Sequence, residues 1–238
     1  MLNDFQNQKA FPESLVSSQA STLFLAKVFN WMAVGLGVTA AIAFMTVSSG
    51  GVEVIRNNQL LFFGLIFGEL GLVIYLSARI KNISAATATG LFLFYSALNG
   101  ATLSVLLMIY TSTSVAATFI IAAGMFAAMA IYGTVTKKDL SSLGSFMFMG
   151  LFGIIIASVV NIFMGSAMIA WVVSAIGVVV FTGLTAYDVQ KISRYGAGGV
   201  MESGEGAIRK GAIIGALTLY LDFINLFLSL LRLMGDRR

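Results

Sequence analysis

The stretches FTGLTAYDVQKI (residues 181–192) and ALTLYLDFINLF (residues 216–227) each place one aspartate, Asp188 and Asp222, inside a long apolar run. Runs of this kind are typical of helices that span a membrane. A carboxylate in hydrocarbon costs several kcal/mol, so an acid at such a position predicts a functional site with a partner. The most economical partner for each aspartate is the other one.

The composition of the whole chain supports a membrane location. Of its 238 residues, 58% are hydrophobic and only 10% are charged, which lies outside the usual range of soluble domains. A spanning helix needs about 20 apolar residues, so the length allows roughly six to eight spans and no sizeable soluble domain. Seven continuous apolar runs are present: residues 22–47, 60–78, 85–110, 115–135, 143–164, 167–195 and 212–233.

These runs predict an all-α integral membrane protein, a bundle of seven transmembrane helices. They are too long and too continuous for the alternating strands of a membrane barrel. We expect a polar cytoplasmic segment at residues 1–21 and a single membrane domain at residues 22–238. The polar start lacks a basic region, which argues against a cleaved signal peptide. Glycine-rich residues 193–209 are expected to form a flexible loop, and Gly165–Ser166 a tight turn.

The distribution of basic residues predicts the orientation. Ten of the fourteen lysines and arginines fall on the side of the N-terminus, so the positive-inside rule places that end in the cytoplasm and the C-terminus outside. Arg232, Arg237 and Arg238 near the tail argue against this assignment, and a re-entrant last span would put both ends inside. No basic patch interleaved with aromatic residues suggests a nucleic-acid partner.

Polar residues in the last two spans recur at helical spacing. In the last span, one helical face carries Gly211, Gly215, Thr218, Asp222, Asn225 and Ser229. A similar stripe in the preceding span carries Ser174, Gly177, Thr185 and Asp188. Small and polar faces turn towards the interior of a membrane bundle, where they pack closely and find partners. The last helix is therefore predicted to be the central one.

The two aspartates are predicted to lie at compatible depths in the cytoplasmic half, roughly 10 and 15 Å from the ends of their spans. Two carboxyl groups in a dry site cannot both ionise cheaply, so the pair should titrate as a unit. When protonated it would hold the two helices together. When both groups are ionised, the two carboxylates would repel each other and offer oxygen ligands to Ca²⁺. In the alternative interpretation, neighbouring hydroxyl and amide donors hold each aspartate as a packing element.

Glu69 is a third acid within a span, and Arg79 lies about ten residues beyond it, roughly 15 Å along a helix. Arg79 is either a flanking residue that reaches the membrane surface or a counter-ion to the aspartate pair. Asn99, Asn161 and Asn225 would either extend a polar path or join helices by hydrogen bonds.

Several chemistries lack the residues they need. The chain has no histidine and no cysteine, which removes Ser-His and Cys-His nucleophiles, the HExxH zinc motif and thiolate metal sites. A retinal protein needs a lysine at the middle of its last span, and this chain has none there. An aspartic intramembrane protease needs a GxGD motif within a span, whereas the Gly-Asp pair at residues 235–236 is expected outside the membrane. We therefore expect no enzyme activity and no cofactor.

The segments TAYDVQKI (185–192), ALTLYLDFINLFLSLLRL (216–233) and TKKDLSSLGSFMFMGLFGIIIASVVNIF (136–163) resemble the Bax inhibitor-1 family, also called the transmembrane Bax inhibitor motif family, in particular its bacterial YccA-type branch. The likeness runs from about residue 23 to the C-terminus, and LYLDFINLF is its most specific part. This resemblance implies seven helices wrapped around the last one, and a pH-sensitive calcium leak gated by an aspartate pair, here Asp188 and Asp222. It also implies that an acid and an arginine of the second helix, here Glu69 and Arg79, take part in the site.

Two functions follow as alternatives. The first is a pH-sensitive calcium leak channel or cation exchanger in the bacterial inner (plasma) membrane, with calcium or protons as the transported species. Its site would comprise the gating pair and a polar path through Thr185, Thr218, Asn225 and Ser229. The second, which some bacterial relatives suggest, is a regulatory protein of the lipid bilayer that binds a membrane protease or modulates a stress or cell-death response.

Overall fold

The computed structural model describes residues 13–238, and most of the predicted N-terminal segment lies outside the described residues. The described chain forms α1 (Glu13–Ser48), α2 (Gly51–Asn57), α3 (Gln59–Arg79), α4 (Ala85–Ile109), α5 (Ser112–Val135), α6 (Ser141–Met164), α7 (Ala167–Ala197), the 3₁₀ helix η1 (Val200–Glu202) and α8 (Glu205–Met234). Within this part of the chain, seven helices are long and apolar enough to cross a membrane, all except α2 and η1. The prediction of an all-α bundle of seven spanning helices is confirmed.

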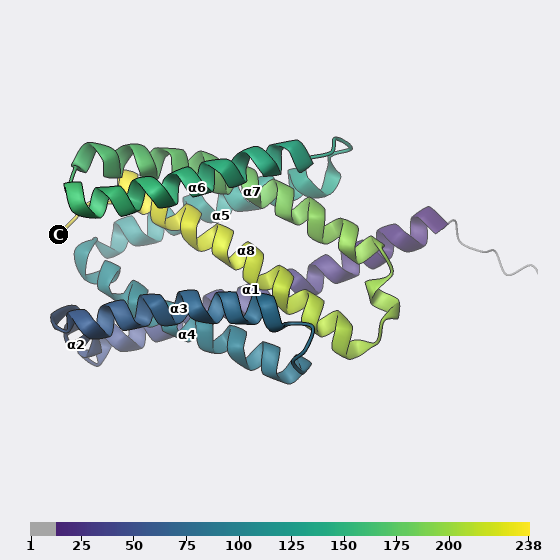
Figure 1. Ribbon diagram of the computed structural model, residues 1–238, viewed down its shortest axis with the longest axis horizontal. Coiled ribbons are helices and arrows are strands. Elements are labelled where there is room, and N and C mark those ends of the chain that lie inside the picture. The colour runs from purple at the N-terminus through teal and green to yellow at the C-terminus, as the bar shows by residue number, and fades with distance from the viewer. Residues whose placement is uncertain (1–12) are drawn as a thin grey trace, which may run out of the picture.

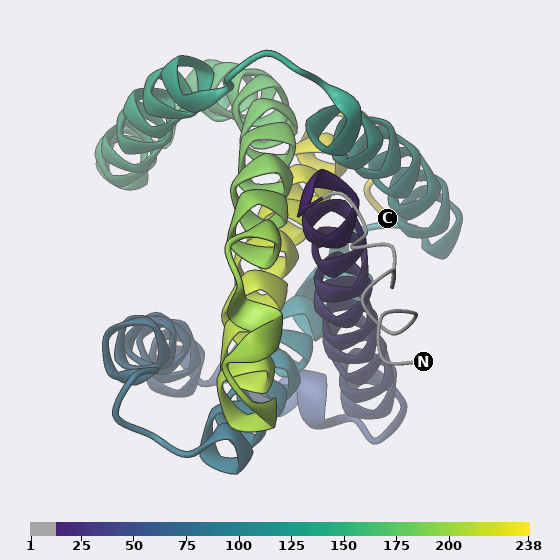
Figure 2. The ribbon, with the colours of Figure 1, turned by 90° about the vertical axis from the view of Figure 1, so that its right-hand side faces the viewer.

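The last helix, α8, lies at the centre of the bundle. Figure 1 shows it crossing the middle of the molecule, with α3 and α4 on one side and α6 and α7 on the other. In its most apolar stretch 72% of the residues are buried, compared with 6% in α3 and in α6. The end-on view of Figure 2 places α3 and α6 at the outside of the bundle. Their exposed Phe, Ile and Leu side chains are the surface that lipid would cover.

The helix ends follow from local hydrogen bonding. Asn58 and Ser84 begin α3 and α4, because their side-chain oxygens accept hydrogen bonds from the backbone N–H of Leu61 and Thr87. The predicted tight turn between α6 and α7 is confirmed, since α6 ends at Met164 and α7 begins at Ala167. Short connections of this kind make neighbouring helices antiparallel.

The prediction of a long flexible loop at residues 193–209 is wrong. Helix α7 continues to Ala197, η1 follows, and α8 begins at Glu205 rather than near Ala212. The chain reverses at Gly199 and Gly204, whose φ angles of 84° and 83° favour glycine. The glycines therefore make two tight turns around η1, where Val200 is buried.

The two ends of the described chain lie at opposite ends of the bundle (Figure 1). The tail after α8 is fixed to the connection between α4 and α5: Thr111 N–H donates to the Asp236 carbonyl at 3.0 Å, and Arg238 N–H donates to the Ile109 carbonyl at 2.9 Å. Because α8 is one uninterrupted helix between Glu205 and this tail, the alternative of a re-entrant last span is wrong.

Candidate functional site

The two aspartates meet where α7 packs against α8. Asp188 is 4% exposed and Asp222 is 5% exposed, and their carboxyl groups are hydrogen-bonded to each other. Two carboxyl groups can share a hydrogen bond only when one of them carries a proton, because a carboxylate has no donor. The contact between the two carboxyl groups therefore fits a pair that holds one proton.

The pair has few other hydrogen-bond donors. Asp222 Oδ2 is fully buried, and no protein group within the described residues donates to it. A buried acceptor without a donor is uncommon and costs about 1–3 kcal/mol. If the aspartates were only packing elements, hydroxyl or amide groups would donate hydrogen bonds to their oxygens. No described group donates to Asp222 Oδ2, so a proton or a cation is the group that would complete this site.

The residues of the predicted polar path lie along the same seam between α7 and α8, but they are not linked to one another across it. The side chains of these residues each donate a hydrogen bond to the carbonyl four residues earlier in their own helix: Thr185, Thr218, Asn225 and Ser229. Beyond the pair the seam is closed, because a Cβ added to Gly177 would lie only 2.6 Å from Ser229 Oγ. A path for ions along this seam would require α7 and α8 to separate.

A cavity of about 520 Å³ leads towards the pair from the end of the bundle where α3 and α7 end and α8 begins. Asp188 lines this cavity, and Asp222 does not. Apolar side chains of Phe24, Ile80 and Ile214 form much of its wall. Access to the buried pair from this end therefore passes through Asp188 first.

Glu69 belongs to a separate polar cluster on another side of α8. Its carboxylate accepts hydrogen bonds from Asn99 Nδ2 at 3.1 Å and Thr102 Oγ1 at 2.5 Å. The Tyr220 hydroxyl donates to Asn99 Oδ1 at 3.1 Å and shares a 2.6 Å hydrogen bond with Thr39. This cluster joins α1, α3, α4 and α8, and Tyr220 at its centre is fully buried.

Arg79, the candidate counter-ion, is exposed at the end of α3. The one ion pair within the described residues joins Arg194 to Asp139 at 3.1 Å, on the outside of the bundle. The structure therefore brings neither Arg79 nor Glu69 to the aspartate pair.

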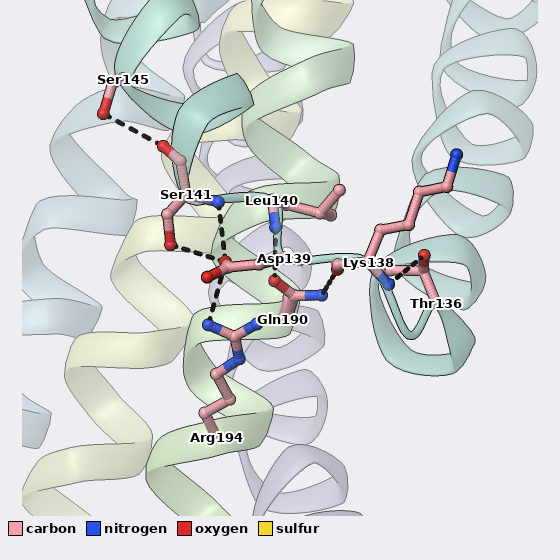
Figure 3. A network of polar contacts seen from close by, with 8 residues as sticks. All are labelled: Thr136, Lys138, Asp139, Leu140, Ser141, Ser145, Gln190 and Arg194. Carbon is pink, nitrogen blue, oxygen red and sulfur yellow. Dashed lines mark hydrogen bonds and ion pairs between the residues drawn. The ribbon is translucent and has the colours of Figure 1, made fainter.

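Helix α7 is fixed from its other side by the α5–α6 connection, as Figure 3 shows. Buried Gln190 donates to the Lys138 carbonyl at 2.8 Å and accepts from the Leu140 N–H at 3.0 Å. Arg194 pairs with Asp139, whose pKa is held below its usual value of 3.8 by hydrogen bonds from Ser141 and then by the Arg194 guanidinium. Gln190 was not predicted from the sequence, although a lone amide two residues from Asp188 in an apolar helix is a signal for a buried hydrogen-bonding residue.

The pair by itself offers a metal ion two carboxyl groups as ligands. Within the described residues, no group of three or more acidic, histidine or cysteine side chains is placed to hold a metal. Calcium takes about six to eight oxygen ligands, so an ion at Asp188 and Asp222 would keep water or recruit backbone carbonyls.

The fold and the buried acid pair define a seven-helix integral membrane protein. Residues 21–238 match the family described as "Inhibitor of apoptosis-promoting Bax1". The chain is 48% identical over 228 residues to the inner membrane protein YbhL of Escherichia coli K12, covering 95% of this chain and 97% of that protein. It is 40% identical over 217 residues to an uncharacterized membrane protein of Streptococcus pyogenes serotype M1, covering 89% of this chain and 92% of that protein. The chain belongs to the Bax inhibitor-1 family.

Proposed function

We propose that this protein is a pH-sensitive leak channel or exchanger for cations, calcium foremost, in which Asp188 and Asp222 form the gate. The observation that carries the proposal is the hydrogen-bonded pair itself, buried in the α7–α8 seam at the inner end of a cavity. Acids within membrane spans mark ion pathways and proton relays, so such an acid is a functional-site hypothesis by default. The proposal assigns no catalytic step to the chain.

Gating follows from the charge of the pair. With a shared proton, the two carboxyl groups attract each other and hold α7 against α8, and the close contact of Gly177 with Ser229 keeps the seam shut. Loss of that proton places two like charges in a site of low dielectric, where their repulsion is strong. The helices then separate, and the freed oxygens supply ligands to a cation.

The proposed setting is the bacterial inner membrane, as for the relative named YbhL, with the N-terminus in the cytoplasm. The cavity opens at the end of the bundle where most lysines and arginines lie, so the positive-inside rule makes its mouth cytoplasmic.

The test is calcium flux into liposomes that contain purified protein, between about pH 5 and pH 8, for wild type and Asp222→Asn. We expect wild-type flux to rise with pH by up to about tenfold per unit, the limit for control by one proton. In Asp222→Asn the amide donates to Asp188 at every pH, so the flux should lose its pH dependence while the protein stays folded.

Two results would contradict the proposal. One is equal pH dependence in the variant and the wild type. The other is the absence of flux above that of empty liposomes at every pH, which would favour the regulatory alternative of a membrane protein that modulates a protease or a stress response.

A further inference from the structure

Three lysines converge on the mouth of the cavity from different parts of the chain. Lys81 follows α3, Lys191 lies in α7 and Lys210 lies near the start of α8, and all three line the cavity. Lys210 Nζ donates to the Lys81 carbonyl at 3.1 Å, and Lys191 Nζ lies 5.8 Å from the centre of the Tyr187 ring. None of the three forms an ion pair within the described residues.

This cluster of positive charges is electrostatically unfavourable when no anion is bound to it. Three ammonium groups around one opening repel each other. Among the described residues, Asp188 is the one acid that lines the cavity, and it lies at the buried inner end. The same charges would repel a cation that approaches Asp188 from this side. The positive charge at the mouth of the cavity should therefore attract an anion.

The walls of the cavity restrict the kind of anion. Phe24, Ile80, Ile192 and Ile214 make the lining mostly apolar, whereas a free inorganic anion would gain nothing from an apolar wall. Lys81 follows the end of α3, and Lys191 and Lys210 lie near the ends of α7 and α8. Lysines near the ends of spanning helices are expected at the depth of the lipid headgroups. An apolar wall with a cationic rim at this depth matches an amphiphile with an acyl chain and a negative phosphate.

We propose that the cavity binds one anionic phospholipid, with its phosphate held by Lys81, Lys191 and Lys210 and part of an acyl chain against the apolar wall. The bound phosphate neutralises the mouth and removes the barrier to cations outside Asp188. Binding of the lipid itself does not depend on the proposed leak function, and it is measured without any flux.

The experiment counts lipids retained by the full-length protein. Purified protein in neutral detergent is stripped of lipid, titrated with phosphatidylglycerol or with phosphatidylcholine, and examined by native mass spectrometry. Three proteins are compared: wild type, Lys81→Gln/Lys191→Gln, and the control Lys137→Gln/Lys138→Gln. The control removes the same charge from exposed positions in the α5–α6 connection. A parallel titration uses inorganic phosphate alone.

We expect wild type to retain one phosphatidylglycerol in clear preference to phosphatidylcholine. Removal of each lysine should weaken this binding about fivefold, so that the Lys81/Lys191 variant approaches the phosphatidylcholine level while the control keeps the preference. Equal loss in both variants, or no loss in either, would overturn the proposal. Displacement of phosphatidylglycerol by phosphate alone would show a free-anion site and would overturn the assignment to lipid.

Discussion

The acidic site of Glu69 on α3 and the acidic site of Asp188 and Asp222 between α7 and α8 differ in how their carboxyl groups are satisfied. Glu69 receives two hydrogen bonds, from Asn99 and Thr102, and its cluster continues through Tyr220 to Thr39. Asp188 and Asp222 are bonded to each other, and Asp222 Oδ2 has no donor among the described residues. The first site is complete without any further group, whereas the second requires a proton or a cation.

On the proposed function, this difference separates a structural role for Glu69 from a switching role for Asp188 and Asp222. The Glu69 carboxylate, with its two hydrogen bonds from α4, joins α3 to α4. A pair without donors has two states, bonded when it carries a proton and repulsive when it does not. Of the three intramembrane acids found in the sequence, the two aspartates are therefore the ones suited to gating.

The largest expected effect comes from replacing Asp188, with Glu69 of the other site as the matched comparison. Asp188→Asn should abolish the pH dependence of calcium flux, because the new amide bonds Asp222 regardless of proton concentration. Glu69→Gln is the matched variant, and its amide oxygen can still accept from Thr102, so the pH dependence should survive. Flux measurements in liposomes across the same pH range check both. A flat pH profile for Glu69→Gln would show that the two acidic sites act together, and Glu69 would then have more than a structural role.

The next effect concerns the stability of the Glu69 cluster. Tyr220→Phe removes the donor to Asn99 and leaves a buried amide oxygen unpaired, which should cost about 1–3 kcal/mol. Tyr95→Phe is the control, because the ring centres of Tyr95 and Tyr220 lie 5.6 Å apart. The Tyr95 hydroxyl has no hydrogen bond within the described residues, so its removal breaks none. Thermal unfolding in detergent measures both. Equal losses in the two variants would mean that the hydrogen bond from Tyr220 to Asn99 adds no stability of its own to the cluster.

A smaller effect is expected on the outer side of α7. Gln190→Leu removes two hydrogen bonds to the α5–α6 connection, and we expect a loss of about 1–2 kcal/mol in thermal unfolding. The pH dependence of flux should persist, although α7 carries both Gln190 and Asp188. A Gln190→Leu variant with a flat pH profile would show that this connection belongs to the gate.

The smallest effect belongs to the exposed ion pair of Asp139 with Arg194. Asp139→Asn should change the melting temperature less than Gln190→Leu does, because exposed pairs are weak and screened by salt. Since the pKa of Asp139 is lowered in the folded protein, its contribution is present above about pH 3.8 and is lost as the pH falls through the lowered pKa. The difference between variant and wild type should therefore vanish only in acid. A difference that changed near neutral pH would point to another group.

Much of the fold could be predicted from the sequence, and the errors have local causes. The starts and ends of most spanning helices agree with the apolar runs within a few residues. Residues 193–209 were expected to be a loop because of their glycines, yet a helix that leaves the membrane can continue in polar sequence, as α7 and α8 do. The contact between Asp188 and Asp222 could be predicted because each lay on the single polar face of its helix, and such faces turn inwards.

Hydropathy and helical spacing therefore determined by themselves that this is a seven-helix membrane protein with a central last helix and two inward aspartates. Only the tertiary structure decided which groups surround each acid. It joined Glu69 to Asn99 and Tyr220 rather than to the pair, left Arg79 exposed, and gathered Lys81, Lys191 and Lys210 around one cavity. The physical reason is that helix periodicity fixes which face of a helix is polar, whereas the neighbour of that face depends on how helices distant in the sequence pack together.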